Sequence, residues 1–469
     1  MKSDCFAVLD IGKTLTKLTL WSHDRRRVDR RTRINNKSSS NGYMCLDAVG
    51  IADWMGGVLK DFAAEGTVKA IVPVAHGAAA ALIDDRGLCL APLDYESEPP
   101  AEIVAEYRKK CDPFSVTGTP ALPQCLNLGL QLYWLERVAP EAMRRGRIVT
   151  WPQYWAWLLS GVAATEVTSL GCHTGLWQPA AGKPSPMAVS RGWAERLAPL
   201  HRAGDALGPV TEEWRRRTGL PADCQVLCGL HDSNAALLAA RQYPEIGGRE
   251  CTVISTGTWF VAMHSVAPGA KCDLSALSEK RDCLVNVDAF GVPVPSARFM
   301  GGRETELIER ADGTMLDPAE HKDELIRLAA KAVAEDTYVL PAVQRGVGPY
   351  PDNAGGWSKR PENEAERRAV AGLYLALMTD ASLALLGAHG TLAIEGRFAG
   401  DPVFTGALAA LRPDRPVYLL PVLDNLSLGA LHLAAPYPPR EKPTKVEPLA
   451  IDLSGYAARW RKRAERGWP

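Results

Sequence analysis

The sequence predicts two α/β domains, residues 1–242 and 243–469, each built on a mixed sheet with flanking helices. Three observations lead to this prediction. A chain of 469 residues is too long for a single ordinary hydrophobic core. Each half opens with a strand, a glycine turn and a second strand. Each half then alternates strands with helices, so that the two halves form a weak two-fold repeat.

The first half begins with an apolar run at residues 6–12, which predicts a buried strand leading into a glycine turn. The alternating pattern of residues 16–21 predicts the second strand of a hairpin. The arginines of residues 25–33 are interpreted as a solvated hairpin end rather than a nucleic-acid site, because the total charge is balanced. Further predictions in this half are a strand at residues 70–75 and helices at residues 101–111, 126–138 and 153–160.

The predicted domain boundary lies at residues 243–248, where a proline and paired glycines end an alanine-rich helix. Residues 252–255 and 259–263 predict a second hairpin with Gly257 in its turn. Residues 300–304 are predicted to form a simple loop. Later elements are predicted as helices at residues 319–334 and 364–386 and a short strand at residues 391–394.

Composition argues against several classes of protein. Hydrophobic residues make up 46% and charged residues 23% of the chain, which is close to an average globular protein. Lys plus Arg and Asp plus Glu both number 54, so that neither a nucleic-acid partner nor a membrane partner is expected. The eleven cysteines show no zinc-ribbon spacing, and no signal peptide is visible. We therefore expect reduced, mostly buried thiols and a cytoplasmic protein.

Residues 10–17 form the first candidate phosphate site. Gly12 allows the backbone to approach a phosphate closely. Lys13 or Lys17, with the hydroxyls of Thr14 and its neighbour Thr16, can donate hydrogen bonds to it. Asp10, at the strand end, suits a magnesium ion held through water. By itself the motif fits a purely structural hairpin equally well.

Two further segments offer chemistry of the same kind. The hydroxyl-rich turn with Gly257 and Thr258 can wrap phosphates with backbone N–H groups, although an ordinary hairpin turn explains it as well. Asp232 follows a strand and a glycine turn and starts a helix. It is either a helix cap or a carboxylate that accepts the proton of an attacking hydroxyl.

The order and spacing of the three segments resemble the FGGY family of carbohydrate kinases over nearly the whole chain. That family belongs to the actin-like ATPase superfamily, which implies two ribonuclease-H-like domains with a cleft between them. The resemblance implies that Asp232 is the catalytic base and that Asp10 holds Mg²⁺ through water. It also implies that ATP phosphates bind at Gly12, Lys13, Thr14, Gly257 and Thr258, all lining one cleft. Lys17 and Thr16 are expected to point away or to support the hairpin.

The resemblance further implies a sugar site and an adenosine site. The sugar residues are His76, Gln153, Tyr154, His231 and Asp232, and the adenosine residues are Gly396, Gly400 and Asn425. Two positions depart from the family pattern. Gln153 replaces an aspartate before the tyrosine, and Glu395 replaces a glycine of the adenosine motif. His231 before the base is similar to the kinases for rhamnulose and fuculose.

The function predicted from the resemblance is transfer of phosphate from ATP to a small sugar, a ketose or deoxyketose such as L-rhamnulose or L-fuculose. The first domain is expected to bind sugar and phosphate, and the second the nucleotide. Two alternatives remain open: a sugar-sensing protein of the same fold that has lost catalysis, and another actin-like ATPase. The sequence decides neither the sugar nor the phosphorylated hydroxyl, and it leaves open whether the chain forms a homodimer.

Overall fold

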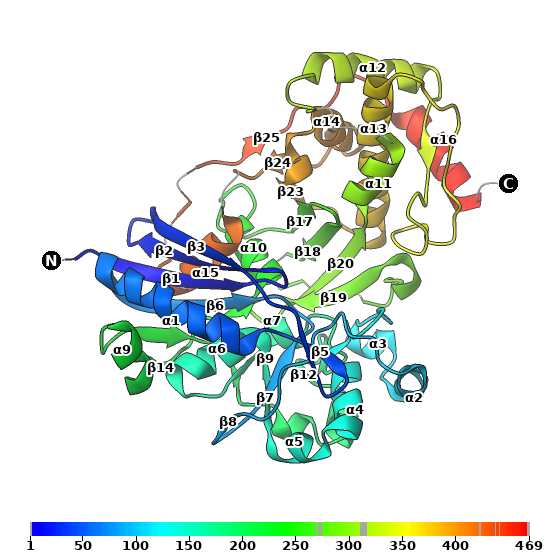
Figure 1. Cartoon of the computed structure of the whole chain (residues 1–469). Coiled ribbons are helices and arrows are strands. Elements are labelled where there is room, and N and C mark those ends of the chain that lie inside the picture. Colours follow the sequence, from blue (N-terminus) through cyan, green and yellow to red (C-terminus); the bar gives the residue numbers. More distant parts are fainter. Residues whose placement is uncertain are drawn as a thin grey trace. The chain divides into compact units, whose positions relative to one another are not determined.

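The computed structural model describes residues 2–267, 269–270, 274–309, 317–421, 424–436, 438–439 and 441–466 (Figure 1). The chain forms two compact units. The first unit consists of Met1–Ala239, Val285–Pro293 and Asp424–Pro438, and the second of Ala240–Leu284, Val294–Leu423 and Pro439–Pro469. The units are therefore not two contiguous stretches, because two short segments of the second half join the first unit.

The elements before residue 241 begin with the hairpin strands and end with the helix that starts at Asp232. The strands are β1 (Asp4–Ile11), β2 (Leu15–Ser22), β3 (Arg27–Ile34), β4 (Ser38–Ser40), β5 (Tyr43–Cys45), β6 (Thr67–Ala75), β7 (Ala80–Asp84), β8 (Gly87–Leu88), β9 (Arg147–Thr150), β10 (Thr165–Glu166), β11 (Trp177–Gln178), β12 (Lys183–Pro184), β13 (Leu200–His201), β14 (Ala206–Pro209), β15 (Gln225–Leu227) and β16 (Leu230–His231). The helices are α1 (Ala48–Glu65), α2 (Ala101–Lys110), α3 (Phe114–Thr117), α4 (Leu128–Val138), α5 (Pro140–Arg145), α6 (Trp151–Ser160), α7 (Val167–Leu170), α8 (Pro186–Ser190), α9 (Glu212–Thr218) and α10 (Asp232–Ala240).

The later elements begin with a second hairpin. The strands are β17 (Cys251–Thr256), β18 (Phe260–Ser265), β19 (Cys283–Val287), β20 (Pro293–Phe299), β21 (Val339–Leu340), β22 (Gly356–Trp357), β23 (Thr391–Gly396), β24 (Val417–Leu419) and β25 (Thr444–Lys445). The helices are α11 (Gly301–Glu309), α12 (Lys322–Ala334), α13 (Glu364–Leu385), α14 (Pro402–Leu411), α15 (Asn425–Ala434) and α16 (Ser454–Arg466).

The sheet of the first unit has the strand order β14-β15-β6-β1-β2-β3. Strand β1 runs antiparallel to β2 and parallel to β6. Its side chains alternate between two cores, because Ala7 and Leu9 pack with α1 and α6 while Phe6 and Val8 pack with α10 and α15. A strand covered on both faces needs a nearly continuous apolar run, which is the pattern that the sequence shows here. Asp10 interrupts this run only at the end of the strand.

The sheet of the second unit repeats this connectivity around β17. Strand β17 runs antiparallel to β18 and parallel to β23, and β23 runs parallel to β24. On the far side of the hairpin, β18 pairs antiparallel with β20. The strand–turn–strand start predicted for each half is confirmed in both sheets.

Two predicted local structures differ from the observed ones, and one helix was not predicted. The helix expected at residues 319–334 begins at Lys322. Residues 300–304 enter α11 instead of forming a simple loop. Helix α16 was not predicted, although its buried residues Tyr456, Trp460 and Ala464 recur at helical spacing.

The glycines at the start of α11 explain why the sequence favours a loop there. A Cβ atom at Gly302 would lie 2.3 Å from the carbonyl oxygen of Gly257. Glycine is therefore present because the helix start contacts the hairpin backbone, and not because the chain turns there.

Helix α13 is the long apolar helix of the second unit. By length and composition it would suffice to cross a membrane, and 89% of that stretch is buried inside the protein. Such burial is also what the core helix of a globular protein shows. The ten described cysteines are free, and most of them are buried.

Candidate active site

The β1–β2 turn is closed by backbone hydrogen bonds and by one asparagine. The Gly12 N–H donates to the Leu15 carbonyl at 3.1 Å, and a Cβ atom at Gly12 would lie 2.7 Å from the same oxygen. The Asn35 amide donates to the carbonyls of Gly12 at 2.8 Å and Lys13 at 3.2 Å. The backbone N–H of Asn35 also donates, to the Thr14 carbonyl at 2.9 Å. The turn predicted to bind phosphate is thus held by Asn35, which the sequence motif did not indicate.

Asp10 lies opposite Lys17 in the hairpin register. The Lys17 Nζ is 2.5 Å from Asp10 Oδ2, so that Lys17 supports the hairpin by an ion pair. Burial raises the pKa of the Asp10 carboxyl, and the positive charge of Lys17 opposes that rise.

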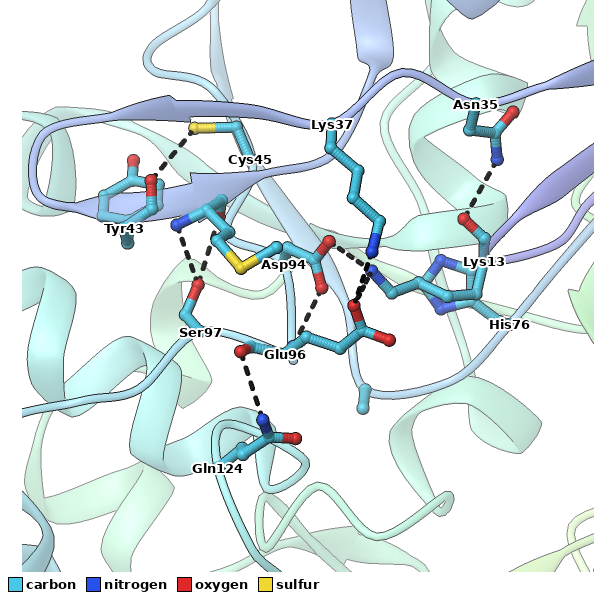
Figure 2. Close-up of polar contacts among 12 residues, drawn as sticks. Lys13, Asn35, Lys37, Tyr43, Cys45, His76, Asp94, Glu96, Ser97 and Gln124 are labelled. Atoms are coloured by element: carbon cyan, nitrogen blue, oxygen red, sulfur yellow. Dashed lines mark hydrogen bonds and ion pairs between the residues drawn. The ribbon is translucent and has the colours of Figure 1, made fainter.

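The Lys13 side chain lies against the segment Asp94–Glu96 (Figure 2). Its ammonium contacts Asp94 Oδ2, lies 3.3 Å from Glu96 Oε2 and sits 5.0 Å from the centre of the Tyr95 ring. The Lys37 ammonium lies 3.6 Å from the same oxygen, Glu96 Oε2. The predicted contact of Lys13 with phosphate stays a prediction, and it would require this ammonium to leave or share its carboxylates.

These groups border a cavity of about 90 Å³ in the first unit. His76 lies at its wall, where it meets the Tyr95 ring edge-on with the ring centroids 5.6 Å apart. Burial lowers the pKa of His76, which favours its neutral form, and its Nδ1–H donates to the Gly77 carbonyl at 2.8 Å. The lining residues that the sequence indicated are Gly12, Lys13, Thr14 and His76, and those that it missed include Asn35, Asp94, Glu96 and Trp151.

Asp232 is the first residue of α10, directly after β16. Its side chain is 29% exposed, and Oδ1 accepts hydrogen bonds from the N–H of Ser233 at 2.6 Å and from the Ser233 hydroxyl at 3.2 Å. A carboxylate at a helix start is stabilised by the helix dipole. The charge of Asp232 also interacts with Asp10 and His76, which assigns all three groups to one region of the first unit.

Two residues predicted to contact the sugar, Gln153 and Tyr154, are buried in this structure, and their sugar contacts stay predictions. Gln153 is fully buried: its amide nitrogen donates to the carbonyls of Cys228 at 3.1 Å and Gly229 at 3.0 Å, and its oxygen accepts from Thr150. Tyr154 is buried and stacks on Trp151 with the rings 5.2 Å apart. Since α6 turns both side chains inward, Gln153 holds the turn that precedes Asp232, and Tyr154 belongs to the core.

The β17–β18 turn of the second unit is held by a hydroxyl. The Gly257 N–H donates to the Trp259 carbonyl at 3.0 Å. The Thr256 hydroxyl donates to the Glu395 carbonyl at 2.5 Å and accepts from the Phe398 N–H at 3.0 Å. Thr256 thereby ties the turn with Gly257 and Thr258 to the segment that begins at Gly396.

A second cavity, of about 300 Å³, opens beside this segment. Gly400 and Arg368 line it, and Arg368 is buried with its guanidinium 2.5 Å from Asp401 and 3.1 Å from Glu309. Asn425 begins α15, which packs on β1 and β6 of the first unit. Of the predicted adenosine residues, the structure thus groups Gly396 with Gly400 but assigns Asn425 to the other unit. That residues of both units line one cleft stays a prediction.

Comparisons with known proteins show to which family this chain belongs. Residues 248–443 match the C-terminal domain of FGGY carbohydrate kinases. The whole chain is similar to a carbohydrate kinase from Novosphingobium aromaticivorans, at 46% identity over 99% of both chains and with a TM-score of 0.96. The chain belongs to the FGGY family of carbohydrate kinases. This membership makes it an ATP-dependent carbohydrate kinase, as the sequence predicted.

Other relatives of this FGGY kinase are more distant. The L-fuculokinase of Salmonella typhi is 25% identical over 314 residues, which are 59% of this chain and 62% of that enzyme. The xylulose kinase of Rhodospirillum rubrum is 20% identical over 98% of this chain and 97% of its own, with a TM-score of 0.74. The predicted two-domain α/β fold of the actin-like ATPase type is therefore confirmed.

Proposed function

We propose that this FGGY kinase transfers the γ-phosphate of Mg-ATP to a hydroxyl of a ketose or deoxyketose such as L-rhamnulose or L-fuculose, with Asp232 as the general base. The observation that carries the proposal is the partly exposed Asp232 carboxylate in one region with Asp10 and the cavity-lining His76. The similarity to an L-fuculokinase supports the choice of sugar class.

In this mechanism the sugar hydroxyl gives its proton to the Asp232 carboxylate while its oxygen bonds to the γ-phosphorus. The bond from that phosphorus to the bridging oxygen breaks, and ADP leaves. General-base assistance of this kind is typically worth roughly 100- to 10,000-fold in rate. The sugar would bind near His76, where the carboxylates of Asp94 and Glu96 can accept hydrogen bonds from its other hydroxyls.

The turns of the hairpins β1–β2 and β17–β18 would bind the phosphates of ATP. The residues nearest the phosphates would be Gly12, Thr14, Gly257 and Thr258. The cavity beside Gly400 and Arg397 would accept the adenosine. Asn425 remains part of this proposed nucleotide site.

Asp10 is the carboxylate proposed to hold Mg²⁺. Within the described residues, no three or more His, Cys, Asp or Glu side chains are grouped to hold a metal ion. Kinase Mg²⁺, however, is commonly held by one or two carboxylates, by water and by the phosphates themselves. Asp10 supplies such a carboxylate, and its negative charge near Asp232 would be balanced by a cation. The ion, when bound, would neutralise charge on the phosphates.

A coupled ADP-release assay with a panel of ketoses, deoxyketoses and polyols tests the proposal. We expect ADP release that depends on an added ketose or deoxyketose and on Mg²⁺, with a monophosphorylated sugar as the product. ATP hydrolysis that ignores the sugar, or turnover confined to polyols, would contradict the proposed substrate class.

A further inference from the structure

A buried chain of side chains leads to the carboxylate of Asp232. The His231 Nε2 lies 3.1 Å from Asp232 Oδ1, and the His231 Nδ1 lies 3.3 Å from the amide nitrogen of Asn234. His231 is 5% exposed and Asn234 is 2% exposed. Water therefore does not compete freely for either contact, and the geometry of the imidazole is set by the protein.

The hydrogen-bond partners determine the tautomer of His231. An Asp232 that acts as a base is ionised, and its Oδ1 would repel a bare lone pair on Nε2 at 3.1 Å, so the proton belongs on Nε2. Cys172 Sγ, 3.3 Å from the same nitrogen, is then a weak acceptor for that proton. With that proton on Nε2, Nδ1 of a neutral imidazole is an acceptor and matches the N–H₂ group of Asn234. Burial lowers the pKa of His231, which favours this neutral form.

Further contacts hold the backbone and the ring of His231 in place. The His231 N–H donates to the Thr168 hydroxyl at 2.9 Å, and that hydroxyl donates to Glu166 at 2.5 Å. On the other side, Cys172 Sγ lies 3.3 Å from Nε2, and a Cβ atom at Gly77 would lie 2.9 Å from the same nitrogen. These contacts restrain the ring and keep its Nε2 3.1 Å from Asp232 Oδ1.

The two oxygens of Asp232 are consequently unequal. Oδ1 accepts from the N–H and hydroxyl of Ser233 and lies 3.1 Å from His231 Nε2. Among the described residues, none donates a hydrogen bond to Oδ2. Oδ2 is therefore the oxygen that is available to the substrate.

We infer that His231 is a positioning residue: its neutral imidazole, oriented by Asn234, holds Asp232 Oδ1 so that Oδ2 receives the proton of the sugar hydroxyl. The inference rests on the proposed role of Asp232 as the base. It replaces the direct sugar contact predicted for His231, because both ring nitrogens already have protein partners.

The test uses substitutions at the two ends of this chain of contacts in the full-length protein. His231→Phe keeps a flat ring and removes the donor, and we expect kcat to fall roughly 10- to 100-fold with an unchanged KM for the sugar. His231→Gln retains an N–H donor and should recover part of that loss. Asn234→Asp puts an acceptor opposite Nδ1, so it should draw a proton there, lower kcat and move the acid limb of the kcat profile.

Other titratable groups face Asp232 as well, namely Asp10, His76 and Tyr95, and the profiles are therefore compared between variants at equal buffer and salt. His264→Gln is the matched control, because His264 is also buried and lies 3.7 Å from the carboxylate of Glu250, outside the candidate site. We expect it to alter the melting temperature but not the acid limb.

Four results would overturn the inference or the role of Asp232 on which it rests. One is a higher sugar KM at normal kcat in His231→Phe, which would restore a direct sugar contact. Another is an Asn234→Asp profile identical to that of the wild type. The third is normal turnover in Asp232→Asn, which would refute the proposed base itself, whereas loss in Asp232→Asn with normal His231→Phe would refute only the positioning role.

Discussion

The hairpins β1–β2 and β17–β18 close their glycine turns alike but are held by different kinds of group. In both, the glycine N–H donates across the turn, at 3.1 Å for Gly12 and 3.0 Å for Gly257. Charged side chains surround the first turn, where Lys17 pairs with Asp10 and Lys13 with Asp94. The second turn is held by the Thr256 hydroxyl and by close backbone contact with Gly302.

The two proposed phosphate-binding turns are therefore held in different ways. Charged pairs adjust to ligands and respond to salt and pH, whereas a turn held by backbone contacts is set by shape alone. The comparison therefore predicts electrostatic sensitivity in the first unit and steric sensitivity in the second.

The largest effect on stability is expected for Lys13→Met. Asp94 is only 4% exposed, and removal of its ammonium partner leaves a buried carboxylate unpaired. We expect the free energy of unfolding to fall by about 2 to 4 kcal/mol, measured by urea denaturation. Lys37→Met is the matched control: Lys37 is 74% exposed, and its loss should cost less than about 0.5 kcal/mol. An equal loss of unfolding free energy in Lys13→Met and Lys37→Met would mean that the ion pair of Lys13 with Asp94 does not stabilise the fold.

Gly302→Ala tests whether close backbone contact holds the β17–β18 turn. The added Cβ would lie 2.3 Å from the Gly257 carbonyl oxygen, so that α11 and the hairpin must separate. We expect a loss of about 1 to 3 kcal/mol in unfolding free energy and weaker ATP binding. For Gly257→Ala the new Cβ would lie 3.8 Å from the Trp259 carbonyl oxygen, an ordinary contact distance, so this variant should fold normally. A stable Gly302→Ala variant with normal ATP affinity would contradict the account.

Gln153→Leu removes both donors to the Cys228 and Gly229 carbonyls. Buried carbonyls without partners should lower the unfolding free energy by about 1 to 3 kcal/mol, and the loosened turn should reduce kcat. Because Gln153 is fully buried, the KM for the sugar should stay unchanged. A raised KM without loss of stability would instead support the direct sugar contact predicted from sequence.

The smallest effect concerns pH in the second unit. Burial raises the pKa of Glu304 to about 7, so the folded state holds a proton that the unfolded chain has released. Its contribution to stability is complete below the ordinary carboxyl range and is lost as pH rises through about 7. The melting temperature should thus fall by a few degrees between pH 5.5 and 8, and Glu304→Gln should flatten that slope. If the melting temperature changed with pH equally in the wild type and in Glu304→Gln, Glu304 would not be the cause of that change.

The elements that the sequence predicted well are those with local signals. Residues 6–12 show an uninterrupted apolar run, and Asp232 follows a strand and a glycine turn, so neither depends on distant segments. Asn35, Asp94 and Glu96 lie on segments whose approach to Gly12 and Lys13 only the folded chain creates. No periodicity in the sequence marks such contacts.

The sugar contacts predicted for Gln153 and Tyr154 stay predictions, and the sequence did not indicate that both side chains are buried. A motif gives the position of a residue along a helix but not the rotation of that helix about its axis. Packing of α6 on β6, which buries Trp151, Tyr154 and Trp155 in the core of the first unit, sets that rotation. The family resemblance located the segment, and only the packing shows which way it faces.

Turnover of Asp232→Asn, measured together with sugar affinity and melting temperature, tests the central claim most directly. An amide of the same shape keeps the helix start but cannot accept the hydroxyl proton. The account predicts a kcat lower by roughly 100- to 10,000-fold, with sugar affinity and melting temperature close to those of the wild type. Near-normal turnover in a folded Asp232→Asn protein would contradict it, because Asp232 would then be a helix residue and not the base.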